Sequence, residues 1–158
     1  MVDGKNMIKI ALVASAGGHM VEISQLEDFY KRYNHFFVTF KRADTIEMAE
    51  EKKVYFVNDP KRNPFKFFIN FIKSIYILGR ERPNIILTTG AGVAIPISVI
   101  GKIFGRKLIF IESFCRMKEK SLTGKILYPF ADLFLVQWKE MLKSYGKKAI
   151  YVGGVFDV

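Results

Sequence analysis

Short apolar runs alternate along the chain with longer segments in which apolar and polar residues mix. Apolar runs of about four to eight residues, rich in Val, Ile, Leu and Phe, are typical of strands that a parallel sheet buries on both faces. The runs predicted as strands are 7–14, 35–40, 54–57, 84–89, 107–112, 133–137 and 149–153.

The mixed segments carry apolar residues at helical spacing, which predicts helices between the strands. They span 18–33, 44–51, 65–78, 93–104, 121–130 and a last segment that ends at 145. Asp44 is expected to cap the second helix, and Gly79 and Pro83 are expected to end the third. Strands that alternate with helices predict an α/β fold with a doubly wound, Rossmann-like parallel sheet and helices on both faces.

Two glycine turns follow predicted strands. Gly17 and Gly18 come after Ser15 at the end of the first strand, and Gly90 and Gly92 come after the fourth. Glycine lets backbone N–H groups approach an oxyanion at the start of a helix, and in a doubly wound sheet the first and fourth strands are neighbours. Together the turns are predicted to face one crevice and to grip a diphosphate, although two ordinary tight turns remain the alternative.

Two titratable side chains accompany these loops. His19 is predicted in the first turn of a helix, whose positive end favours the neutral imidazole. It can accept a proton from an attacking hydroxyl or donate to a phosphate oxygen, or it can be an exposed capping residue. Glu112 ends the fifth strand and can bind sugar hydroxyls, act as a base or pair with Arg116.

Composition narrows the class of protein. The 158 residues predict one domain over 1–158, with a flexible leader at 1–6, and one Cys with two His argues against disulfides and a structural metal site. The net charge of +10 favours an anionic partner, but no nucleic-acid-binding motif accompanies it. The first glycine loop lacks the G-x-G-x-x-G pattern that binds NAD, whereas Lys41 and Arg42 after the second strand leave NADP open.

The segment 65–78 has a narrow polar stripe, and apolar residues occupy the rest of its surface. The segment 92–105 is apolar apart from one lysine. Both are too short to span a bilayer, so they are predicted to dock on an anionic membrane surface or, alternatively, on a partner subunit. The residues predicted to dock are Phe65, Lys66, Phe68, Ile69, Phe71, Ile72, Lys73 and Lys102.

Three segments carry a resemblance to a known family: ASAGGHMVE, TTGAGVAIP and FIESFCRMKEKSLTGKILYPFADLFLVQW. They resemble the membrane-docking, acceptor-side subunit of two-component UDP-N-acetylglucosamine transferases of oligosaccharide and polysaccharide biosynthesis. The resemblance extends over 8–154. It also implies similarity to the amino-terminal half of the peptidoglycan lipid-intermediate N-acetylglucosaminyltransferase.

The resemblance implies half of a GT-B glycosyltransferase, whose donor-binding half is a separate partner chain that holds the UDP-sugar. No tightly bound cofactor is expected. Carried over by position, His19 and Glu112 are the expected catalytic residues. The expected diphosphate and acceptor contacts are Ser15, Gly17, Gly18, Gly90, Gly92, Ser113 and Arg116.

Eukaryotic members of the family carry an amino-terminal membrane anchor. None is recognised here, so peripheral contact with the cytoplasmic membrane face through 65–78 and 93–104 is expected. The heteromer is expected to act on a polyprenyl-diphosphate-linked acceptor. The alternatives are a non-catalytic scaffold for a competent transferase and an NADP-binding oxidoreductase.

Overall fold

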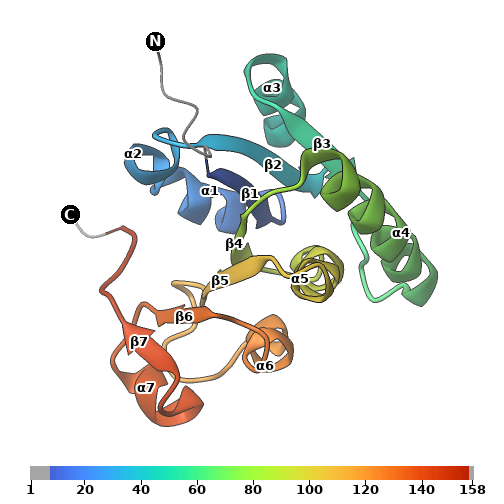
Figure 1. Cartoon of the computed structure of the whole chain (residues 1–158). Coiled ribbons are helices and arrows are strands. Elements are labelled where there is room, and N and C mark those ends of the chain that lie inside the picture. The colour runs from blue at the N-terminus through green and yellow to red at the C-terminus, as the bar shows by residue number, and fades with distance from the viewer. Residues whose placement is uncertain (1–7, 157–158) are drawn as a thin grey trace.

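A computed structural model describes residues 8–156 of the chain, and the leader predicted at 1–6 lies outside them. A seven-stranded parallel sheet forms its centre (Figure 1), with the strand order β3-β2-β1-β4-β5-β6-β7. The strands are β1 (Lys9–Ala14), β2 (Asn34–Phe40), β3 (Val54–Val57), β4 (Ile85–Gly90), β5 (Lys107–Ile111), β6 (Leu133–Val136) and β7 (Ala149–Tyr151). The predicted doubly wound α/β fold is therefore confirmed.

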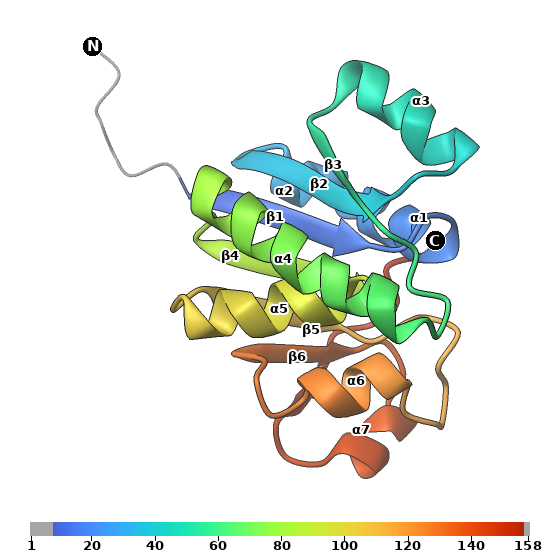
Figure 2. The same ribbon diagram turned by 90° about the vertical axis from the view of Figure 1, so that its right-hand side faces the viewer.

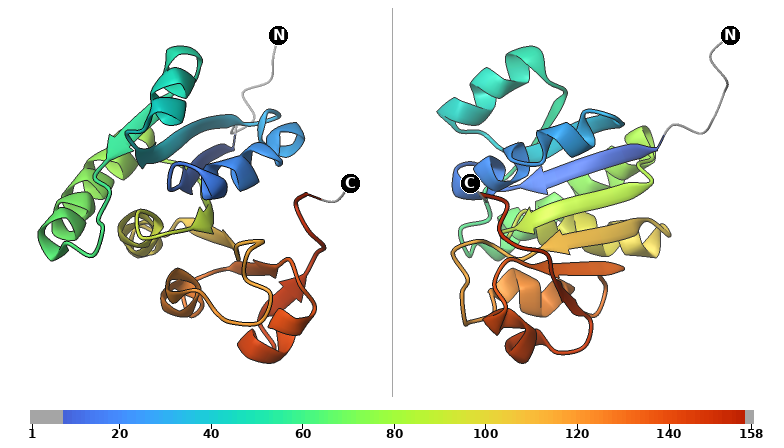
Figure 3. Two further views of the ribbon diagram at one scale, coloured as in Figure 1. Left: turned by 180° about the vertical axis from the view of Figure 1, so that it is seen from behind. Right: turned by 90° about the vertical axis from the view of Figure 1, so that its left-hand side faces the viewer.

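Helices cover both faces of the sheet. They are α1 (Gly18–Ser24), α2 (Glu27–Tyr30), α3 (Ala43–Glu51), α4 (Pro64–Glu81), α5 (Ala94–Ile103), α6 (Leu122–Leu127) and α7 (Glu140–Tyr145). Helices α4, α5 and α6 lie side by side on one face (Figure 2), whereas α1 and α2 lie on the other (Figure 3). The direction of winding reverses between β1 and β4, which pair directly, so loops from both halves of the fold meet at this point.

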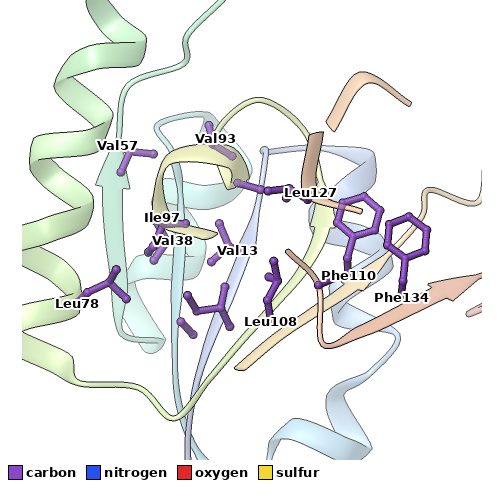
Figure 4. Packing of buried hydrophobic residues seen from close by; sticks show 14 of the residues in the cluster. Val13, Val38, Val57, Leu78, Val93, Ile97, Leu108, Phe110, Leu127 and Phe134 are labelled. Carbon is purple, nitrogen blue, oxygen red and sulfur yellow. The ribbon is translucent and has the colours of Figure 1, made fainter. Parts of the chain in front are cut away.

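Two apolar clusters hold the helices to the sheet. Val13 and Val38 point into the larger cluster, beneath α4 to α7, where the rings of Phe110 and Phe134 stack with centroids 4.8 Å apart (Figure 4). Leu12, the neighbour of Val13 along β1, belongs to the second cluster, beneath α1 and α2. Because successive strand residues point to opposite faces and both faces are covered, the strands read as unbroken apolar runs.

The predicted helix over 18–33 is wrong as one element, because α1 and α2 are separate. The Ser24 hydroxyl donates to the carbonyl of Met20 at 3.0 Å, and the N–H of Leu26 bonds to Ile23, three residues back, at 2.9 Å. A side chain that competes for a helix carbonyl, followed by a three-residue bond, tightens and ends the last turn.

Helix α4 differs from its prediction at both ends. The Asn63 side chain accepts hydrogen bonds from the N–H groups of Phe65 and Lys66, so the helix begins at Pro64. The helix also continues through Gly79, and it ends only where Arg82 adopts a left-handed backbone conformation (φ 48°). An interior glycine weakens a helix but does not stop it when packing on a sheet holds both sides.

Smaller differences lie at other element ends. Helix α3 begins one residue before Asp44, which lies inside the helix and accepts the N–H of Thr45 at 3.1 Å rather than capping it. Helix α6 ends at Leu127 instead of 130, and β7 ends at Tyr151 instead of 153. These ends fray because single turns at the surface have few packing contacts to extend them.

Candidate functional site

A cavity of 450 Å³ lies where β1, β4 and β5 end, between the two glycine loops and the loop after β5. It confirms the prediction that both glycine loops face one crevice. Its lining residues are Gly18, His19, Glu22, Thr89, Gly90, Ala91, Gly92, Ile95, Ser113, Cys115, Arg116, Ser121, Leu122 and Thr123. Of the expected site residues, Ser15, Gly17 and Glu112 do not line it.

The two glycines of the first loop serve different needs. Gly17 has φ 87°, and a Cβ there would lie 2.6 Å from Nη1 of Arg42. Gly18 opens α1 with nothing within 4 Å of an added Cβ, so its backbone faces open space in the cavity. Gly17 therefore makes the turn, whereas Gly18 leaves room for a ligand. Ser15 lines a neighbouring cavity instead.

The second loop is strained and lies directly against the first. Gly90 has φ 106° and Ala91 has φ 71°, a region that a residue with a Cβ rarely adopts. The Thr89 hydroxyl donates to the backbone oxygen of His19 at 2.8 Å, and a Cβ at Gly90 would lie 3.8 Å from Cε1 of that ring. Strain held in place by such a contact is typical of binding and catalytic loops.

His19 lines the cavity, and one of its ring nitrogens is unsatisfied. Its Nδ1 atom is buried, and no residue between 8 and 156 forms a hydrogen bond with it. An unpaired buried polar atom costs about 1–3 kcal/mol, so native structures keep few of them without a reason.

Glu22, one helical turn after His19, is a site residue that the sequence analysis missed. Its side chain is buried and accepts hydrogen bonds from Ser113 Oγ (2.9 Å), the N–H of Phe114 (3.2 Å) and Gln137 Nε2 (3.2 Å). Burial raises the pKa of the Glu22 carboxyl, and the hydrogen bond from Ser113 and the charge of His19 oppose that rise. The three-residue spacing from His19 was the available signal, because such pairs share a helix face.

Glu112, in contrast, is a predicted site residue that the structure does not place in the cavity. Its carboxylate is 1% exposed, does not line the cavity, and accepts hydrogen bonds from the Ser113 N–H and from the N–H and hydroxyl of Ser121. Tyr145 donates to it as well, and burial together with this carboxylate raises the pKa of that phenol. The donors of Ser113, Ser121 and Tyr145, rather than Arg116, occupy its oxygens, so Glu112 organises the loop after β5.

That loop presents Ser113, Cys115, Arg116 and Ser121 to the cavity. Ser113 is held between the two buried carboxylates, since its N–H donates to Glu112 and its hydroxyl donates to Glu22. Arg116 and Cys115 are both exposed at the rim. The guanidinium of Arg116 therefore supplies a positive charge beside the glycine loops, where an anionic group can bind.

The surface of α4 is apolar and exposed on one side. Phe65, Phe68 and Ile72 are 71%, 61% and 56% exposed, whereas Ile69 and Phe71 are half-buried. This side of α4 has the exposure that the predicted membrane contact needs.

The predicted polar stripe of α4 is only partly a solvent face. Asn70 and Ser74 are buried, and the Asn70 amide exchanges two hydrogen bonds with the backbone of Asn58, at 2.9 and 2.8 Å. The residues of the stripe therefore have different roles. The Asn70 amide fixes the loop before α4, and the Ser74 hydroxyl donates to the Asn70 carbonyl at 2.6 Å, whereas Lys66 and Lys73 line a basic cleft. That cleft has a volume of 850 Å³ and also contains Lys41, Arg42 and Lys61.

Helix α5 corrects the expectation that 93–104 forms a membrane surface. Six of its residues, from Ala94 to Gly101, are buried between the sheet and the helices beside it. Only its last turn is open, at Ile103 (72% exposed) and Phe104 (43%). Lys102 forms an ion pair with Asp132 at 2.7 Å. An all-apolar helix is thus explained by burial on several sides.

Solved structures share this fold at low sequence identity. The crystal structure of Acinetobacter baumannii MurG, a GT-B protein, matches with a TM-score of 0.77 and 12% identity, over 93% of this chain and 46% of that one. UDP-N-acetylglucosamine 2-epimerase from Rickettsia bellii matches with a TM-score of 0.76 and 12% identity, over 95% and 46%. The chain therefore spans about half the length of these structures, and the fold it shares with MurG is that of the amino-terminal half.

Sequence relatives identify the family. The human UDP-N-acetylglucosamine transferase subunit ALG14 is 28% identical over 190 residues, which cover 98% of this chain and 86% of the human protein. The Schizosaccharomyces pombe subunit alg14 is 40% identical over 98 residues, 57% of this chain and 46% of that protein. The family model described as "Oligosaccharide biosynthesis protein Alg14 like" matches residues 57–155, more than half of the chain. This protein therefore belongs to the Alg14-like family of oligosaccharide biosynthesis proteins.

Proposed function

We propose that this chain is the acceptor-side subunit of a two-component glycosyltransferase. The enzyme transfers a sugar, N-acetylglucosamine, from a UDP-sugar to a polyprenyl-diphosphate-linked acceptor. Family membership and relatives named as UDP-N-acetylglucosamine transferase subunits support the reaction class. The observation that carries the proposal is the cavity between two glycine loops, which His19 lines together with Glu22 and Arg116.

His19 is the proposed base. The acceptor hydroxyl attacks the anomeric carbon of the donor sugar, and the bond from that carbon to the UDP oxygen breaks. UDP leaves with the electron pair, while the proton of the hydroxyl passes to the imidazole. Glu22 is the proposed positioning residue, because a carboxylate one turn away stabilises the imidazolium that forms.

The acceptor diphosphate is proposed to bind between the glycine loops and Arg116. Gly18, Gly90 and Gly92 line the cavity, with Gly18 exposed at the start of α1, and the guanidinium adds the only fixed positive charge among the lining residues. Ser113 lies beside them, positioned by both buried glutamates.

A separate chain is proposed to bind the UDP-sugar. The fold matches about half of the length of MurG, and the cavity opens at the sheet edge where a second domain can face it. This chain would then need no tightly bound cofactor of its own. Membership of the Alg14-like family gives no support to the NADP-dependent alternative.

Membrane contact is proposed through α4. No helix within residues 8–156 is both long and apolar enough to cross a bilayer. The exposed Phe65, Phe68 and Ile72 and the adjoining basic cleft form a surface that suits the interface of an anionic membrane. We place this contact at the cytoplasmic membrane face, where the lipid-linked acceptor would be presented.

Reconstitution with the donor-binding partner tests the function. The chain alone is expected to show no transfer from UDP-N-acetylglucosamine to a lipid-diphosphate acceptor, and the pair is expected to be active. Turnover by the chain alone would refute the two-component proposal. Full activity of a His19→Ala pair would favour the scaffold alternative.

Co-sedimentation with anionic vesicles tests the membrane contact. We expect Phe65→Gln with Phe68→Gln to weaken binding about tenfold, because two exposed aromatic side chains leave the interface. Ile103→Gln, on α5 and 72% exposed, is the matched control and should bind as the wild type does. Equal binding of the double variant would exclude α4 as the docking surface.

A further inference from the structure

An apolar slot of 480 Å³ lies beside the candidate site, between the loop before α4 and the first turns of α4, α5 and α6. In Figure 2 these turns lie at the same edge of the sheet. Phe67 of α4 forms one wall, and Leu122 and Ile126 of α6 form the other. Val93 and Ile95 close its inner side, and both are buried.

The slot adjoins the cavity that contains His19. Ala91, Gly92, Ile95 and Leu122 line both spaces, so the two lie side by side. The two spaces differ in chemistry. One brings together an imidazole, a carboxyl, hydroxyls and a guanidinium, whereas the other has mainly aliphatic and aromatic walls.

Positive charge lies at the opposite rim of the slot. Lys61 and Arg62 are exposed there and adopt left-handed backbone conformations, with φ 36° and 61°. The slot is thus an apolar space whose rim carries a net positive charge, Lys61 and Arg62 against Asp59, and Arg116 lines the adjoining cavity. An occupant that satisfies both features has a hydrocarbon chain joined to an anionic group.

We infer that the slot binds the isoprene units next to the diphosphate of the acceptor lipid. This inference rests on the proposed function and adds to it the place where the lipid leaves the catalytic cavity. A volume of 480 Å³ suits a small organic group and is too small for a whole polyprenyl chain. The remainder continues past Phe65 and Phe68, which are exposed at the start of α4, toward the membrane.

Isothermal titration of the full chain with short soluble ligands tests the slot. The probes are inorganic diphosphate, geranyl diphosphate and farnesyl diphosphate, each below its micelle concentration. We expect affinity to rise by about tenfold or more from inorganic to farnesyl diphosphate, because buried CH₂ groups each add to binding. Equal affinity for all three probes would overturn the inference.

Uncharged substitutions show which residues produce the gain in affinity for farnesyl diphosphate. Ile126→Gln and Phe67→Gln change opposite walls of the slot without altering its charge, and each should lose about tenfold in farnesyl diphosphate affinity while inorganic diphosphate binds unchanged. Ile103→Gln is the matched control, because that residue is exposed and does not line the slot, whereas Phe68→Gln reports on the outer surface of α4. Circular dichroism confirms that each variant is folded.

The outcomes separate this inference from the proposed function. If the reconstituted pair transfers sugar but Ile126→Gln keeps the full gain for farnesyl diphosphate, the slot inference fails alone. A gain lost in Phe68→Gln instead would assign the lipid to the outer surface of α4 and also overturn it. If no sugar is transferred while the gain depends on Ile126 and Phe67, the slot stands and the proposed reaction fails.

Discussion

Two buried glutamates lie at the carboxyl edge of the sheet, one in the region after β1 and one in the region after β5, and their surroundings differ. Glu112 accepts four hydrogen bonds from its own loop and from α7, and it does not line the cavity. Glu22 lines the cavity beside His19, and burial raises its pKa. Burial alone therefore does not distinguish the two carboxylates; they differ in that only Glu22 lines the cavity.

The largest expected effect tests Glu112 as the structural member of the pair. Glu112→Ala should lower the free energy of unfolding by about 4 kcal/mol, because buried donors of Ser113, Ser121 and Tyr145 lose their acceptor. Chemical denaturation measures it, with the exposed Glu119→Ala as the control. A loss under about 1 kcal/mol would contradict the structural role.

Gly124→Ala tests the same network from the other side. An added Cβ would lie 2.0 Å from the Tyr145 hydroxyl and 2.5 Å from Oε2 of Glu112, so we expect a loss of about 3 kcal/mol in the free energy of unfolding. Gly79→Ala is the matched control: it lies inside α4 with nothing within 4 Å of the new Cβ, and should stabilise by up to about 1 kcal/mol. Equal effects of the two substitutions would show that the carboxylate network is loosely packed.

His19→Ala tests the cavity side of the comparison. We expect kcat of the reconstituted pair to fall at least about 100-fold, equivalent to about 2.7 kcal/mol, because a proton acceptor is lost. The melting temperature should change little, since Nδ1 has no partner within residues 8–156. His35→Ala is the control, because that ring lies on β2, where its Nδ1 contacts the backbone oxygen of Tyr33 at 2.9 Å. A similar kcat loss in both variants would argue against a specific role for His19.

Glu22→Gln should have the smallest effect, about tenfold in kcat or 1.4 kcal/mol, because it removes a charge beside the imidazolium but keeps the shape. The raised pKa of Glu22 also predicts a pH dependence. The folded state holds this proton more tightly than the unfolded state, so wild-type stability falls as pH rises from the ordinary value of 4.5 through the raised one. Glu22→Gln lacks this fall, so its melting temperature should rise relative to that of the wild type as pH increases over this interval. Parallel melting curves against pH would contradict a raised pKa at Glu22.

Several features of this protein follow from the sequence by itself. The apolar runs fix the strands and the doubly wound sheet, because a strand buried on both faces needs apolar residues at successive positions. Glycine positions mark both loops of the candidate site, since a positive φ such as that of Gly17 or Gly90 is costly for other residues. The sequence also identifies His19 as a candidate site residue, because it directly follows one of these glycine turns.

Only the tertiary structure decides which polar side chains line the cavity and which apolar side chains remain exposed. Glu22 and Glu112 are separated by ninety positions, and only the packing of α1 on the loop after β5 brings Ser113 between them. Helix α5 has an apolar sequence that fits a membrane surface equally well, yet the neighbouring helices bury most of it. The hydrophobic periodicity predicts whether a side chain is buried or exposed. It does not predict which residues a buried side chain contacts, because these come from distant parts of the chain.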